Sequence, residues 1–219
     1  MKPEIFYCYD AWCGWCYGFS PVIKRIAEEY GDSIHFEVLS GGMIINENPR
    51  HIAAMAGYIQ DAYKTVEEYT GIKFGEDFLW HIKNPDKSDW FPDSGKSAIA
   101  MCIFKEYYPE QQVAFASDLQ YSLKYEGRDL TDDEAYRHLL EKYNIPAEDF
   151  YTKLKSEEYK EKAHYEFALC EQLKVTGFPT VLMRVSESKF YLLARGYSSY
   201  DGLHKTIESV LVEIAGTPH

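Results

Sequence analysis

The spacing of apolar residues at the start of the chain changes from strand-like to helix-like and back. Residues 4–10 are rich in aromatic and β-branched side chains, and residues 33–39 alternate apolar and polar side chains, so both are predicted strands. Between them, apolar residues recur at helical spacing from Val22 to Tyr30, which predicts a helix that begins near Cys13. The opening of the chain is therefore predicted as strand, helix, strand.

A long middle segment, from about residue 48 to residue 174, carries only helical spacing. Residues 71–93 have few periodic signals and are predicted as a loop. Three helix starts are expected from their capping residues: Asn48-Pro49, Ser94 and the capping-box pattern Thr131–Glu134.

After Gly177 the pattern returns to two strands, joined by a short turn at residues 186–188, and a last helix over residues 200–215. The expected fold is an α/β fold with a mixed sheet, ordered β-α-β and then β-β-α, with a large all-helical insertion. The expected domains are a discontinuous sheet domain, residues 1–46 and 175–219, and a helical insertion domain, residues 47–174.

Composition narrows the class of protein. The chain has 219 residues and a net charge of −12, which argues against nucleic acid as a partner because that affinity depends on neutralising phosphates. It has no apolar run of the ~18 residues that a membrane span needs, and its first residues show no signal-peptide core. The five cysteines are an odd number, which is typical of a reducing compartment, so a cytoplasmic location is expected.

Cys13 and Cys16 form a C-x-x-C pair where the first predicted strand meets the helix. A helix N-terminus stabilises a thiolate through its free N–H groups and its dipole. The first cysteine of such a pair lies nearer the helix end, so Cys13 is expected to attack and Cys16 to resolve the mixed disulfide. Gly14 and Trp15 carry no charge, so the redox potential of the pair stays open.

The main alternative interpretation of Cys13 and Cys16 is structural: they could be two of the ligands of a zinc ion. A structural zinc ion usually needs four ligands, commonly from two close pairs, and the chain has no second such pair, so no metal site is expected. Isolated Cys8, Cys102 and Cys170 are expected to be core thiols.

A second element is Thr176-Gly177-Phe178-Pro179-Thr180, just before the predicted hairpin. By itself Gly-x-Pro is an ordinary turn signal. A cis-proline loop beside the cysteines would instead leave the carbonyl and N–H groups of Phe178 free to pair with a substrate backbone.

The strand, the CGWC motif, the helix and the later TGFPT segment together resemble the thioredoxin superfamily. The helical insertion and the stretch YCYDAWCGWCYGF resemble its DsbA-like branch, and within it the cytoplasmic protein-disulfide isomerases and the FrnE-type proteins. This resemblance covers essentially the whole chain. It implies a thioredoxin-like fold, Cys13 as the attacking thiol, Cys16 as the resolving thiol and Pro179 as a cis-proline.

Three positions depart from that branch. Many relatives carry a buried acid six positions before the first cysteine, where this chain has Tyr7, so the proton-transfer role is vacant or moves to Asp10. Asp10 has an alternative as an exposed loop or capping carboxylate. Trp15 stands where DsbA has a histidine that favours the thiolate, which implies a weaker oxidant, a reductase or an isomerase. Phe178 is bulky and is expected to narrow the peptide groove.

The expected substrate-binding residues are those around the pair and in the proline loop: Trp12, Gly14, Trp15, Phe178 and Pro179. Trp12 has an alternative as a core residue. The expected partners are protein or small-molecule thiols and disulfides and an unidentified redox partner, with no cofactor except that glutathione is an option.

The function expected from these features is thiol–disulfide exchange by oxidation, reduction or isomerisation. A glutathione-dependent transferase or isomerase, like the kappa-class transferases and 2-hydroxychromene-2-carboxylate isomerases, is the first alternative, although those enzymes use a serine in place of Cys13. A non-catalytic redox-sensing or chaperone module is the second.

Overall fold

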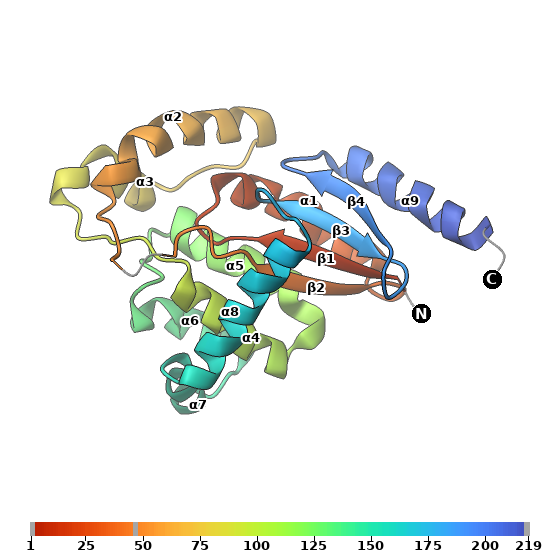
Figure 1. Ribbon diagram of the computed structural model, residues 1–219. Helices are drawn as coiled ribbons and strands as arrows, with labels where there is room; N and C mark the ends of the chain where they lie inside the picture. The colour runs from red at the N-terminus through yellow and green to blue at the C-terminus, as the bar shows by residue number, and fades with distance from the viewer. Residues whose placement is uncertain (1–2, 46–47, 217–219) are drawn as a thin grey trace.

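A four-stranded mixed sheet forms the centre of the molecule in the computed structural model, which describes residues 3–45 and 48–216 (Figure 1). The strand order is β2-β1-β3-β4; β1 pairs in parallel with β2 and antiparallel with β3, which pairs antiparallel with β4. The strands are β1 (Glu4–Tyr9), β2 (His35–Ser40), β3 (Thr180–Arg184) and β4 (Phe190–Arg195). The predicted mixed sheet is therefore confirmed.

Strand β1 is buried on both faces, because its alternate side chains enter two different apolar clusters. Ile5, Tyr7 and Tyr9 belong to the main core, where the Tyr7 ring packs against Phe19 of helix α1. Phe6 and Cys8 point the other way, into a small cluster that Cys170 of helix α8 completes. In Figure 1, α8 crosses the near face of the sheet and α1 lies behind it.

Helices supply the rest of the described chain, and most of them fall between β2 and β3. Helix α1 connects β1 to β2, and α9 follows β4, as predicted. The α-helices are α1 (Gly14–Tyr30), α2 (Ala53–Thr70), α3 (Glu76–Lys83), α4 (Gly95–Tyr107), α5 (Gln112–Lys124), α6 (Arg137–Tyr143), α7 (Ala147–Leu154), α8 (Glu157–Gln172) and α9 (Tyr200–Gly216). Short 3-10 turns are η1 (Pro85–Lys87), η2 (Pro109–Gln111) and η3 (Asp133–Tyr136).

The predicted helix start at Asn48-Pro49 is wrong, because α2 begins at Ala53 with Ile52 in the N-cap position. The Ile52 side chain is fully buried, and its backbone N–H donates to the carbonyl oxygen of Trp90 at 2.9 Å. The chain before α2 is therefore held against the segment around Trp90, and the proline precedes the helix instead of opening it.

Two other predicted caps act differently from the expectation. Ser94 does precede α4, but its side chain makes no capping bond. In the Thr131–Glu134 pattern, Asp132 is the capping residue, accepting from the backbone N–H of Glu134 at 3.0 Å, and it opens the 3-10 turn η3 instead of an α-helix. The predicted loop over residues 71–93 contains α3, which was missed because eight residues show little periodicity.

The division into two domains stays a prediction. Its first boundary, between residues 46 and 47, lies outside the described residues. Over residues 3–45 and 48–216, no helix combines the length and the apolar character that crossing a membrane requires.

Candidate active site

Cys13 occupies the N-cap position of α1, which follows directly from the short connection after β1. Its backbone N–H donates to the carbonyl oxygen of Asp10 at 3.1 Å, which closes the turn between strand and helix. Its Sγ accepts a hydrogen bond from the backbone N–H of Cys16 at 3.4 Å. The sulfur therefore lies where helix N–H groups and the helix dipole favour negative charge.

The two thiols of the pair differ in their tendency to ionise. The hydrogen bond from the Cys16 thiol, together with helix backbone N–H groups, holds the pKa of Cys13 below its ordinary value, although burial opposes this. Burial raises the pKa of Cys16 well above its ordinary value, and charge on Cys13 raises it further. The exposed fractions agree in order: 7% for Cys13 and 0% for Cys16. Cys13 is thus the thiol that ionises first.

The Phe178–Pro179 peptide bond is cis. The family resemblance implied this geometry, whereas the Gly-x-Pro turn signal alone did not. This loop lies beside the pair, and the Cys13 thiol donates to the carbonyl oxygen of Phe178 at 3.4 Å. The expectation that this carbonyl is free is therefore wrong for the thiol form. The Phe178 ring lies against Gly41.

Asp10 is buried, with 2% exposed, so the expectation of an exposed loop carboxylate is wrong. Its carboxylate accepts from the backbone N–H of Trp12 at 2.9 Å, the backbone N–H of Met43 at 2.7 Å and the Ser94 hydroxyl at 2.9 Å. Burial raises its pKa, although these three donors oppose the rise. Asp10 therefore connects the turn before α1 to the segments that carry Met43 and Ser94.

Tyr7, at the position where relatives carry an acid, lies beneath the pair. Its hydroxyl is buried without an oxygen or nitrogen partner among the residues that the structure describes, and the Cys16 thiol is the polar group beside it. Burial raises the pKa of this hydroxyl well above its ordinary value. Tyr7 can therefore donate to sulfur but cannot serve as a base near neutral pH.

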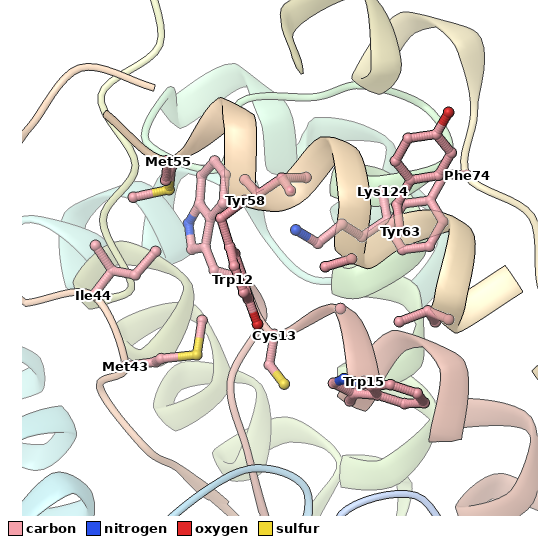
Figure 2. Close-up of a pocket in the computed structure, with 14 residues that line it drawn as sticks. Trp12, Cys13, Trp15, Met43, Ile44, Met55, Tyr58, Tyr63, Phe74 and Lys124 are labelled. Atoms are coloured by element: carbon pink, nitrogen blue, oxygen red, sulfur yellow. The ribbon is translucent and has the colours of Figure 1, made fainter. Parts of the chain in front are cut away.

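A cavity of about 260 Å³ opens beside Cys13 (Figure 2). Helix α2, in the segment between β2 and β3, forms one wall of this cavity through Tyr58, Tyr63 and neighbouring side chains. Of the five predicted substrate-binding residues, Trp12, Gly14 and Trp15 line this cavity, whereas Phe178 and Pro179 do not. The remaining lining residues are apolar or aromatic apart from one lysine: Met43, Ile44, Met55, Ile59, Ala62, Val66, Phe74 and Lys124.

The two tryptophans beside the pair play different parts. Trp12 is both core and lining, since it is 4% exposed and its indole N–H donates to the carbonyl oxygen of Asp93 at 3.0 Å. Trp15 is half-buried, and its ring lies edge-on to Tyr69 of α2 at 6.1 Å between centroids. Trp15 is the more accessible of the two to a molecule that approaches Cys13.

Lys124 is the residue at this site that sequence reasoning missed. It is the last residue of α5 and 2% exposed, and it lines the cavity with Cys13. Figure 2 shows its ammonium group extending toward Trp12 above Cys13. The only signal in the sequence was that Lys124 directly follows Leu123, an apolar residue of a predicted helix. This signal is weak, because lysine is common at helix C-termini.

The other cysteines lie away from this site, as expected. Cys8 and Cys170 are buried together on the opposite face of β1. Cys102, in α4, is buried and donates to the Glu166 carboxylate at 3.5 Å. Within residues 3–45 and 48–216, no cluster of three or more histidine, cysteine or acidic side chains could hold a metal ion.

Solved structures similar to this fold include three structures of two proteins with low sequence identity. A protein from Nitrosomonas europaea described as a putative protein disulfide isomerase has a TM-score of 0.85 and 23% identity, covering 97% of this chain and 99% of its own. The cytosolic disulfide reductase DsbM from Pseudomonas aeruginosa has a TM-score of 0.74 and 22% identity, covering 96% and 99%. DsbM with glutathione has a TM-score of 0.71 and 23% identity, covering 95% and 99%.

A 2-hydroxychromene-2-carboxylate isomerase is also similar, with a TM-score of 0.61 and 15% identity, covering 97% of this chain and 96% of its own. Among curated proteins, no sequence matches the chain. The family model described as the DSBA-like thioredoxin domain matches residues 4–208, nearly the whole chain. Together with the cysteine pair at the start of α1 and the cis-proline loop beside it, this match shows that the chain belongs to the DSBA-like thioredoxin domain family.

Proposed function

We propose that this protein is a thiol–disulfide oxidoreductase in which Cys13 is the nucleophile and Cys16 is the resolving thiol. The unequal ionisation of the pair carries the proposal. Cys13, at the helix N-terminus, has a lowered pKa, and Cys16, one turn into the helix, has a raised pKa. A thiolate next to a protonated partner is the arrangement that attack followed by resolution requires.

The reaction proceeds in two exchange steps. The Cys13 thiolate attacks one sulfur of a substrate disulfide, forms a mixed disulfide, and releases the other sulfur as a thiolate. Cys16 then loses its proton and attacks Cys13, which releases the reduced product and leaves a Cys13–Cys16 disulfide. Oxidation of a dithiol substrate runs through the same steps in reverse.

Substrate contacts are assigned to two surfaces that meet at Cys13. The cavity beside it offers Trp12, Gly14 and Trp15 to an apolar group. The Phe178–Pro179 loop offers a carbonyl oxygen that the Cys13 thiol occupies until it ionises or reacts. Because this carbonyl is a backbone group, it suits a peptide N–H as well as a small molecule.

Substitution of the nucleophile tests the proposal. We expect Cys13→Ser to abolish reduction of insulin or of a small aromatic disulfide, and Cys16→Ser to accumulate a mixed disulfide with the substrate. Cys102→Ser, which changes a buried thiol outside the site, is the matched control. Full activity in Cys13→Ser would refute the proposal.

The redox potential of the pair decides the direction of electron flow. Titration against glutathione or dithiothreitol buffers, read by thiol labelling, gives that potential directly. A value near about −270 mV would mark a reductant like thioredoxin, and one near about −120 mV an oxidant like DsbA. A reductase acting in the cytoplasm agrees with the odd number of cysteines and with the cytosolic DsbM among the similar folds.

Glutathione chemistry is the second candidate. The observations that favour it are the cavity beside Cys13 and the similarity of the fold to DsbM with glutathione and to the 2-hydroxychromene-2-carboxylate isomerase. Glutathione would then be either the small thiol partner of the pair or a cosubstrate. Transferase or isomerase turnover that survives Cys16→Ala would favour the cosubstrate role, because those reactions need no resolving thiol.

A further inference from the structure

The side chain of Lys124 is a buried cation that lines the same cavity as Cys13. Its Nζ lies 4.5 Å from the ring centroid of Phe78 in α3 and 5.0 Å from that of Trp12. Among residues 3–45 and 48–216, this ammonium group donates to no acceptor and forms no ion pair within bonding distance. Two aromatic faces attract an ammonium group only weakly compared with the water that it has lost.

The elements packed around Lys124 supply few groups that could balance its charge. The turn before α1 supplies the Asp10 carboxylate, and α1 supplies the Cys13 and Cys16 thiols. Helix α2 contributes Tyr58 and Tyr63 to the shared cavity.

The charge on these groups changes at only one place during the proposed reaction. The Asp10 carboxylate accepts from one donor in its own turn and from two donors on other segments, and the proposed reaction makes or breaks no bond to it. The lowered pKa of Cys13 favours its thiolate in the reduced pair, whereas Cys13 carries no charge in the disulfide. Negative charge beside Lys124 therefore appears when the pair is reduced and disappears when it is oxidised.

We propose, resting on the function proposed above, that Lys124 is a positioning residue whose ammonium group balances the Cys13 thiolate in the dithiol state and gives up its proton when the Cys13–Cys16 disulfide forms. Burial supports this role, because it lowers the pKa of Lys124 to about 8, while negative charge on Cys13 opposes that fall. A lysine with such a pKa can change its protonation with the redox state of the pair near neutral pH.

The protons balance in the reduction of one substrate disulfide. Two sulfur–sulfur bonds form and two break, two electrons pass from the pair to the substrate, and two substrate sulfurs leave as thiolates. One leaving thiolate receives the proton lost by Cys16. The other receives the proton lost by Nζ of Lys124, so two protons are released from the enzyme although Cys13 began as a thiolate.

The first experiment measures Lys124 in the unmodified protein. NMR titration of its ¹³Cε resonance in the oxidised and the reduced forms gives its pKa in each. We expect a higher pKa in the reduced form. Equal values in the two forms would overturn the proposal, and this measurement does not depend on any variant folding.

The second experiment separates charge from proton release. Arginine keeps the charge but stays protonated at all relevant pH values. We therefore expect Lys124→Arg to preserve the rate of Cys13 alkylation at pH 7 but to release one proton per electron pair near pH 8, where the wild type releases more than one. Lys124→Met removes the positive charge and should raise the pKa of Cys13 by about one. This would slow the alkylation of Cys13 about tenfold, because the thiolate is the form that reacts.

Lys73→Met, which removes an exposed lysine near the same helices, is the matched control and should change neither quantity. Wild-type values in both Lys124 variants would refute the role of Lys124 while leaving the proposed function intact. A wild-type protein without any reversible Cys13–Cys16 disulfide would instead refute the proposed function itself.

Discussion

The sulfur of Cys13 lies 3.4 Å from the carbonyl oxygen of Phe178, a residue 165 positions further along the chain. While Cys13 is a thiol, its S–H donates to this carbonyl. When Cys13 ionises, the donor is lost and the carbonyl can accept from another N–H group. Ionisation of the nucleophile and exposure of a backbone acceptor for substrate are therefore linked through one pair of atoms.

The Cys16 thiol is the largest cause that lowers the pKa of Cys13, so removing it should have a measurable effect. We predict that Cys16→Ala raises the pKa of Cys13 and shifts the pH profile of its alkylation by iodoacetamide to higher pH. Below the shifted value the variant should react more slowly than the wild type, and far above it the rates should converge. An unchanged profile would show that the helix N-terminus alone sets the pKa.

Asp10 offers a test of the turn before α1. In Asp10→Asn, the side-chain NH₂ group replaces one carboxylate oxygen and faces one of the three donors, so that hydrogen bond is lost. We therefore predict that this variant lowers the free energy of unfolding by about 1–3 kcal/mol. Urea unfolding measures this, with exposed Asp86→Asn as the control. If Asp10 also transfers a proton, the variant should slow the resolving step by Cys16 at saturating substrate, whereas a purely structural role would leave that step unchanged.

Local patterns predicted the sheet, α1 and the cysteine pair, because strand alternation and the position of Cys13 at a helix start are short-range properties. Pro179 needed the family resemblance, since Gly-x-Pro by itself is an ordinary turn. Burial of Asp10 could not be predicted, because it depends on Met43 and Ser94 arriving from other segments. Lys124 was missed for the same reason: its neighbours Trp12 and Phe78 belong to other parts of the chain.

Glu106 in α4 provides a test of stability against pH. Although partial burial opposes it, hydrogen bonds from Lys162 at 2.8 Å, Tyr159 at 2.5 Å and Lys153 at 3.2 Å lower its pKa to about 2. A lowered pKa stabilises the folded state above the unfolded value of 4.5, and this stabilisation is lost as the pH falls through about 2.

We therefore predict that Glu106→Gln is less stable than the wild type at pH 7, by less than about 1 kcal/mol because the carboxylate is 40% exposed. The difference should shrink below pH 4.5 and vanish near pH 2. Thermal unfolding at several pH values measures it, and a difference that does not depend on pH would contradict the ion-pair explanation.

Gly41 lies directly after β2, where the ring of Phe178 covers it. A methyl group at this position would overlap the ring, so Gly41→Ala must displace Phe178 and with it the carbonyl beside Cys13. We predict that this variant loses about 1–3 kcal/mol of unfolding free energy, as overpacked sites do. We also expect its rate of disulfide reduction to fall severalfold, with a changed pH profile of Cys13 alkylation.

Gly177→Ala is the matched control, because a methyl group there meets nothing within 4 Å although the residue adjoins Phe178. It should keep both the stability and the alkylation profile of the wild type. If Gly41→Ala loses stability but keeps the wild-type alkylation profile, the Phe178 carbonyl does not influence the ionisation of Cys13. If both glycine variants change the alkylation profile equally, the change results from altered flexibility of the loop. The contact between Phe178 and Gly41 would then not be what positions the Phe178 carbonyl.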